Sequence, residues 1–182
     1  AILELHHPFR SSISDLNTYR SHSQFTLIFE EFLLFALSLK LRRHQYQTWR
    51  VQPIIPDLEF INYFIKRLPF ELTSAQKKVL KQIESDLTSG NLMNRLLQGD
   101  VGSGKTLVAI IGALYLIRAG QQVVLMAPTE IRANQHYQRW NLILKEFGIE
   151  VALITGGQSK EKNELVEKIR QGKIHLVIGT HA

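Results

Sequence analysis

The spacing of apolar residues changes along the chain and divides it into two regions. Between residues 25 and 39 the apolar positions recur every three or four residues, as on one face of a helix: Phe25, Phe29, Phe32, Ala36 and Leu39. This spacing predicts a long helix that begins near Ser14 or Tyr19 and ends near Thr48. The apolar window is shorter than the roughly 20 residues that a membrane span needs, and it holds two glutamates. We therefore expect a buried helix and no membrane partner.

A second, shorter helix is predicted over residues 57–67, after the proline-containing stretch "QPIIP" that no helix interior tolerates. The first region contains no glycine and no cluster of polar side chains typical of a site. We place the division between the two regions near Pro69. The predicted domains are a helical linker over residues 1–69 and a second domain over residues 70–182.

The second region alternates short apolar runs with helical patterns. Strands are predicted over residues 94–98, 122–127, 150–155 and 173–179, and helices over residues 72–90, 105–119, 130–147 and 159–171. Gly120, Gly148 and Gly172 each follow a helix, where a left-handed cap is favourable. The alternation predicts an α/β fold, with a parallel sheet and helices on both faces. Right-handed crossovers then bring the carboxyl ends of the strands to one rim, where chemistry is expected.

One loop of the second region has the pattern of a phosphate-binding loop. The residues Gly99, Asp100, Val101, Gly102, Ser103, Gly104, Lys105 and Thr106 match G-x-x-x-x-G-K-[ST] at every fixed position. Such glycines let backbone N–H groups converge on an anion, and the helix that follows adds its positive end. Lys105 can reach the β- and γ-phosphates, and the Thr106 hydroxyl can ligate Mg²⁺. The strand–loop–helix context disfavours a glycine-rich turn that binds nothing.

The carboxylate that phosphoryl transfer normally needs does not follow any predicted strand. The later strands end in "MAPTE", "LITGG" and "VIGTHA", and none is followed directly by aspartate. Asp100 lies inside the phosphate loop and is a poor substitute. We therefore expect nucleotide binding with little hydrolysis.

Composition narrows the possibilities further. The chain has no cysteine, which excludes disulfides and cysteine-ligated zinc and fits a reducing compartment. Its formal net charge of +6 suits an anionic partner such as nucleic acid. The chain begins with alanine and ends directly after a strand-like run, which we interpret as a fragment of a longer protein.

Five segments together resemble a known family: "LPFELTSAQ", "LLQGDVGSGKT", "MAPTEIRANQH", "LITGG" and "LVIGTHA". They are similar, in order and spacing, to the first RecA-like lobe of superfamily 2 helicases, and best to the RecG family of ATP-dependent DNA helicases. The resemblance covers residues 68–182 and, more loosely, residues 3–49, which resemble the helical segment between that family's wedge domain and its motor. It implies a RecA-like P-loop fold, ATP and Mg²⁺ as cofactors, and branched duplex DNA as partner in repair and recombination. It also implies a monomer in the bacterial cytoplasm.

The resemblance implies roles for further residues. Gln76 would contact the adenine base, and a DNA-tracking face would comprise Pro128, Thr129, Glu130, Thr155, Gly156, Thr180 and His181. The residues alone allow plainer interpretations. Thr73 and Gln76 form a capping-box pattern, Thr129 can cap a helix with Glu130 in its first turn, and the stretch at Thr155 can be a simple turn.

The family's acidic box, second motor lobe and wedge domain are not among the 182 residues. Unwinding is therefore not expected of this chain alone. Two alternatives stay open: the motor lobe of a transcription-repair coupling translocase, which shares parts of the loop and "GTH" patterns, and a P-loop module that acts as a nucleotide switch.

Overall fold

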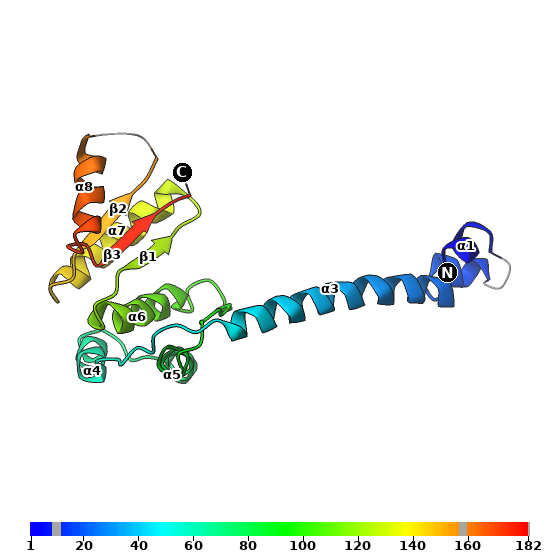
Figure 1. Cartoon of the computed structure of the whole chain (residues 1–182), viewed down its shortest axis with the longest axis horizontal. Helices are drawn as coiled ribbons and strands as arrows, with labels where there is room; N and C mark the ends of the chain where they lie inside the picture. The colour runs from blue at the N-terminus through cyan, green and yellow to red at the C-terminus, as the bar shows by residue number, and fades with distance from the viewer. Residues whose placement is uncertain (9–11, 157–159, 182) are drawn as a thin grey trace. The chain divides into compact units, whose positions relative to one another are not determined.

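The chain folds as two compact units. The computed structural model describes residues 1–8, 12–156 and 160–181, and the units are Ala1–Arg50 and Val51–Ala182 (Figure 1). Gly157 of the predicted turn and Ser159 at the start of the last predicted helix lie outside the described residues.

The first unit is helical, with α1 (Ile2–His6), α2 (Ile13–Asn17) and the long helix α3 (His22–Thr48). The predicted long helix is confirmed, but its predicted burial is wrong. Phe25, Phe29, Phe32 and Leu39 are exposed, and so are apolar side chains on other sides of the same helix, such as Leu34 and Phe35. A helix that is apolar all round needs a neighbour on every side, and the described residues do not supply them. None of the described helices is both long and apolar enough to cross a membrane.

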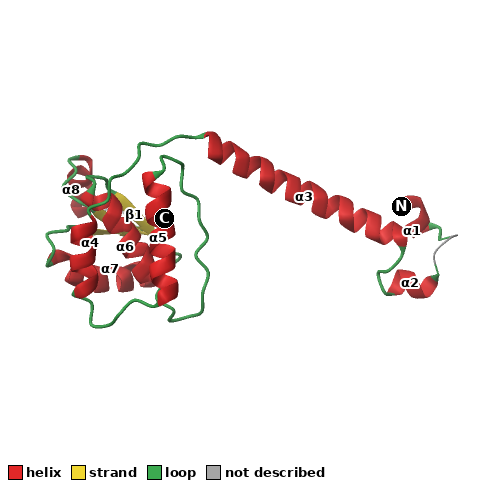
Figure 2. Ribbon diagram, turned by 90° about the horizontal axis from the view of Figure 1, so that it is seen from below, coloured by secondary structure: helices red, strands yellow, loops and turns green. Residues whose placement is uncertain are grey.

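Three helices open the second unit and lie side by side, as Figures 1 and 2 show: α4 (Leu58–Lys66), α5 (Ser74–Thr88) and α6 (Lys105–Arg118). Their apolar faces form one core, to which α4 contributes Ile61 and Phe64. Asp57 caps α4 by accepting from the Phe60 N–H at 3.0 Å, and it also pairs with Arg118 of α6 at 2.8 Å. This carboxylate therefore ties the start of α4 to the end of α6.

The sheet has three parallel strands in the order β1-β3-β2. They are β1 (Val123–Met126), β2 (Val151–Ile154) and β3 (Leu176–Gly179). Leu176 and Ile178 face the core that holds α6 and α7 (Glu130–Lys145), whereas Val177 packs with Leu165 and Ile169 of α8 (Lys160–Arg170). Alternate residues of β3 are thus buried on opposite faces, so the predicted parallel sheet with helices on both faces is confirmed.

The predicted strand at residues 94–98 is not a strand. The segment pairs with no strand among the described residues, and Leu96 is 82% exposed, while Leu97 packs against the core. A short apolar run predicts burial of alternate side chains, but a strand also needs a backbone partner beside it. The other predicted strands and helices of this unit are present. Gly120, Gly148 and Gly172 have φ values of 80°, 70° and 71°, as expected of left-handed caps.

The compact units divide at a different place from the predicted domains. Residues 51–69 pack with the second unit, because Ile61 and Phe64 of α4 are buried in its core. The assignment of residues 1–69 to a linker and 70–182 to a motor lobe stays a prediction about a longer protein.

Two leucines of α7 test how the second unit is held together. Leu144 is 0% exposed and Leu142 is 74% exposed, although they lie on the same helix two residues apart. We expect Leu144→Ala to lower the free energy of unfolding by about 2–5 kcal/mol, because it removes buried methyl groups and leaves a cavity. The matched control Leu142→Ala should change it by less than about 0.5 kcal/mol. Urea denaturation followed by circular dichroism measures both, and equal losses would contradict the packing described.

Candidate functional site

The glycine-rich loop leads directly into α6. Gly104 is the N-cap of this helix and has φ 84°, in the left-handed region, and Gly102 has φ 82°. The Ser103 N–H donates to the Asp100 carbonyl oxygen at 3.2 Å and closes a turn within the loop. The first turn of α6 therefore presents its N–H groups, and the positive end of its dipole, beside the loop.

The Lys105 side chain folds back over the start of this loop. Its Nζ donates to the carbonyl oxygens of Gly99 at 2.7 Å and of Asp100 at 2.6 Å. An ammonium group has three N–H donors, so these two bonds leave one for an anion. The lysine is thereby held at the loop, beside the predicted phosphate site.

Gln76 connects α5 to the phosphate loop. Its Oε1 accepts from the Thr73 N–H at 2.9 Å, and the Thr73 hydroxyl accepts from the Gln76 N–H at 3.2 Å, so the predicted capping box is confirmed. The same side chain donates from Nε2 to the Ser103 carbonyl oxygen at 2.9 Å. The cap and a contact with the loop coexist, and the adenine contact stays a prediction.

A cavity of about 450 Å³ opens beside the loop. It is lined by Phe70, Glu71, Thr73, Gln76, Gly102, Gly104, Lys105, Thr106, Leu107, Arg139 and Trp140. Its volume is in the range of small-molecule pockets. Gly99, Asp100, Val101 and Ser103 belong to the same loop but do not line this cavity. The structure thus brings Gln76 together with the helix-proximal half of the predicted phosphate site.

Six of the lining residues were not predicted from the sequence as site residues: Phe70, Glu71, Thr73, Leu107, Arg139 and Trp140. Trp140 was predicted as a core residue, and it is buried, with the Arg139 guanidinium 5.4 Å from its ring centroid. Both side chains come from the second half of α7, which carries no motif. Only the packing of α7 within the core brings them to the loop, so no local pattern could have indicated them. Phe70 and Glu71 lie within "LPFELTSAQ", one of the segments that carry the resemblance, and that is the signal that could have indicated them.

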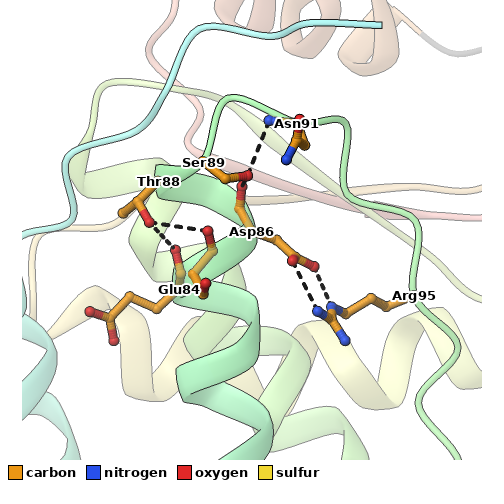
Figure 3. Close-up of polar contacts among 7 residues, drawn as sticks. Glu84, Asp86, Thr88, Ser89, Asn91 and Arg95 are labelled. Carbon is orange, nitrogen blue, oxygen red and sulfur yellow. Dashed lines mark hydrogen bonds and ion pairs between the residues drawn. The ribbon is translucent and has the colours of Figure 1, made fainter. Parts of the chain in front are cut away.

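An ion pair fixes the segment that precedes the loop (Figure 3). The Arg95 guanidinium donates to both carboxylate oxygens of Asp86 near the end of α5, with Nη2 2.9 Å from Oδ1. Its hydrogen bonds lower the pKa of the Asp86 carboxyl below its ordinary value of 3.8. The bidentate pair therefore anchors the unpaired segment at residues 94–98 to a packed helix.

The residues predicted to face DNA gather at one rim of the sheet. They follow the three strands, whose ends are in register because Met126 and Ile154 both lie opposite Gly179. Pro128, Thr129 and Glu130 follow β1, Thr155 and Gly156 follow β2, and Thr180 and His181 follow β3. The predicted common rim is thus present, while DNA contact itself stays a prediction.

Hydrogen bonds organise part of this rim. The Thr129 hydroxyl accepts from the Arg132 N–H at 3.3 Å, so Thr129 caps α7 as predicted. The Glu130 Oε1 accepts from the Gly156 N–H at 2.9 Å and joins two of the three segments. The Thr180 hydroxyl oxygen is buried and has no hydrogen-bond partner among the described residues, an arrangement that costs free energy unless another group satisfies it.

The residues present fit a magnesium ion only as part of a nucleotide complex. No group of three or more His, Cys, Asp or Glu side chains that could hold a metal occurs in residues 1–8, 12–156 and 160–181. The Thr106 hydroxyl, which lines the cavity beside Lys105, is one hard oxygen donor. Mg²⁺ takes few protein ligands and completes its shell with water and substrate phosphates, so one hydroxyl beside a phosphate loop suits it.

Comparison with known proteins defines the class. Residues 73–182 match the DEAD/DEAH box helicase family, and the chain belongs to that family.

Within that class the chain is a homologue of RecG. It is 41% identical over 182 residues to the ATP-dependent DNA helicase RecG of Aquifex aeolicus (strain VF5), covering 100% of this chain and 23% of that protein. It is 44% identical over 158 residues to RecG of Bacillus subtilis (strain 168), covering 85% of this chain and 23% of that protein. The solved structure of RecG bound to a three-way DNA junction matches with a TM-score of 0.77 and 41% identity, over 84% of this chain and 21% of that one. The chain therefore spans about a quarter of the length of these relatives.

Two glycines of the loop allow a controlled test of its geometry. Both need a positive φ, but a Cβ at Gly104 would lie 2.4 Å from the Gln76 Nε2, whereas one at Gly102 meets nothing within 4 Å. We expect Gly102→Ala to cost about 1–2 kcal/mol of stability from backbone strain alone. Gly104→Ala should cost about 1 kcal/mol more, because Gln76 must move and lose its bond to Ser103.

Urea denaturation of the two variants measures this difference. In a Gln76→Ala background the extra cost of Gly104→Ala should disappear, because the crowding side chain is gone. An extra cost that persists there would contradict the contact between Gln76 and the loop.

The Asp86–Arg95 pair predicts a pH-dependent contribution to stability. Because the pKa of Asp86 is lowered in the folded protein, the contribution is full above the ordinary carboxyl value of 3.8 and is lost as the pH falls below it. Arg95→Gln should lower the free energy of unfolding by about 0.5–1 kcal/mol at pH 7, and by progressively less in acid. Thermal denaturation of both proteins across pH measures the difference. The control is Arg170→Gln, because the pair of Arg170 with Glu167 is longer (3.8 Å) and more exposed, and it should leave the free energy of unfolding unchanged. A loss of stability from Arg95→Gln that does not depend on pH would contradict the prediction.

Proposed function

We propose that this chain is the nucleotide-binding first motor lobe of a RecG-like ATP-dependent DNA helicase, preceded by a helical linker. In this proposal residues 1–69 are the linker and residues 70–182 the lobe, and the intact protein remodels branched DNA in repair and recombination. The observation that carries the proposal is the loop at residues 99–106, which joins Gln76 and the first turn of α6 at one cavity. The RecG relatives support it over a transcription-repair coupling translocase.

The loop and α6 would bind the triphosphate of ATP. Backbone N–H groups of the loop and of the first turn of α6 hold phosphate oxygens, and Lys105 donates its ammonium to the β- and γ-phosphates. The Thr106 hydroxyl would ligate Mg²⁺, which when bound neutralises phosphate charge. The Gln76 amide, already fixed by the Thr73 N–H, lies at the same cavity and would contact the adenine.

Hydrolysis would be slow in this chain. The residues directly after β1, β2 and β3 are Ala127, Thr155 and Thr180, none of which is a carboxylate. Phosphoryl transfer in P-loop enzymes uses such a carboxylate to hold Mg²⁺, together with a group that orients the attacking water. We therefore propose that the chain binds ATP and leaves catalysis and unwinding to the intact protein.

The rim formed by the residues after the three strands would track DNA. The relative solved with a three-way DNA junction supports DNA as partner, and the net charge of +6 favours an anionic ligand. A monomer in the bacterial cytoplasm, implied by the resemblance, belongs to the same proposal.

Titration with a fluorescent ATP analogue and Mg²⁺ tests the nucleotide site. We expect saturable binding that Lys105→Ala weakens by about 10- to 100-fold, because the variant loses a charge-assisted hydrogen bond to phosphate. The control Lys145→Ala, which removes a lysine at the end of α7, should bind as the unaltered chain does. Binding that both variants leave unchanged would place the nucleotide elsewhere. Fast ATP turnover by the unaltered chain, abolished by Lys105→Ala, would contradict slow hydrolysis.

A further inference from the structure

Glu130 is an unexpected residue for a surface that tracks DNA. A carboxylate repels the phosphate backbone, and at a rim it weakens the electrostatic attraction on which binding to nucleic acid depends. A plainer role is available, since a negative charge in the first turn of a helix interacts favourably with the helix dipole. Neither role explains the contact that its side chain makes.

That contact joins two segments that are 26 residues apart in the sequence. The Glu130 Oε1 accepts from the backbone N–H of Gly156 at 2.9 Å. Gly156 has no side chain, so the contact with Glu130 is made by its backbone N–H. The carboxylate therefore links the start of α7 to the segment that follows β2.

The Glu130 end of this link is rigid. The Ala133 N–H donates to the Thr129 carbonyl oxygen at 2.9 Å, and Ala133 is fully buried in the core. The Asn134 Nδ2 donates to the Glu130 carbonyl oxygen at 3.0 Å. The backbone of Glu130 is thus fixed by a packed helix, whereas Gly156 is exposed just after the end of β2 and donates its N–H to the Glu130 carboxylate.

We propose that Glu130 is a positioning residue that acts on DNA through Gly156 and makes no contact with DNA itself. Its carboxylate holds the segment of Thr155 and Gly156 at the rim, in line with the residues after β1 and β3. This inference rests on the proposed function, because it assigns the rim to DNA.

Two substitutions separate positioning from charge. Glu130→Gln and Glu130→Ala both remove the negative charge, but only glutamine keeps a side-chain oxygen that can accept from the Gly156 N–H. If Glu130 acted only by repelling phosphate or through the helix dipole, the two variants would behave alike. Glu164→Ala, which removes an exposed carboxylate from α8, controls for the loss of one negative charge.

The test is the affinity of the 182-residue chain for a fluorescently labelled three-way DNA junction, measured by anisotropy at fixed salt. We expect Glu130→Ala to weaken binding about fivefold, the loss that one ordinary hydrogen bond corresponds to. Glu130→Gln should restore the affinity to within about twofold of the unaltered chain. Equal affinities for the two variants, or tighter binding by Glu130→Ala, would overturn the proposal.

The Gly156 amide gives a second readout that does not require DNA. In ¹H–¹⁵N spectra its resonance should shift, and its exchange with solvent should accelerate, in Glu130→Ala and much less in Glu130→Gln. A Gly156 amide that is indifferent to both substitutions overturns the link itself. If the amide responds but the unaltered chain does not bind the junction, it is the proposed DNA role of the rim that fails.

Discussion

The burial of α6 is the constraint on which the rest of the second unit depends. Eight of its 14 residues are buried, against α5 and α4 on one side and the sheet on the other. Such a helix cannot shift or rotate without exposing apolar surface, so its first turn has a fixed position. Lys105 and Thr106 occupy that turn. The core therefore fixes the position of the turn that we propose to hold phosphate, and the loop before α6 needs only to curl around that turn.

The same core gives α7 a place in two sites. The second half of α7 brings Arg139 and Trp140 to the cavity beside the glycine-rich loop. Glu130, the first residue of α7, accepts from the Gly156 N–H at the amino-terminal end of the helix. A helix of 16 residues is about 24 Å long. A single rigid element thus contributes to the candidate nucleotide site and to the rim that we assign to DNA, which is a suitable arrangement for coupling the two.

Local patterns predicted most elements of the second unit but not all of its pairings. The helical spacing and the glycine caps placed α5, α6 and α7 correctly, because those signals depend on neighbours within one turn of the chain. The segment at residues 94–98 is a short run with two adjacent leucines before the glycine-rich loop, and it was predicted as a strand. It forms none, because a strand requires a backbone partner that no local pattern reports. The long helix α3 is a similar case. Its apolar side chains predicted burial, but burial depends on which other surfaces are available, and the described residues leave them exposed.

The sequence by itself determined the glycine-rich loop that leads into α6, the capping box of Thr73 and Gln76, and the three strand ends on one rim. Each depends on residues close together in the chain or on the fixed handedness of parallel crossovers. Only the tertiary structure decided that the Gln76 side chain also bonds to Ser103, that Arg139 and Trp140 line the cavity, and that Glu130 holds Gly156. These contacts join residues that are tens of positions apart. Their existence follows from how α5, α6 and α7 pack on one core, and packing is a property of the whole set of side chains rather than of any single segment.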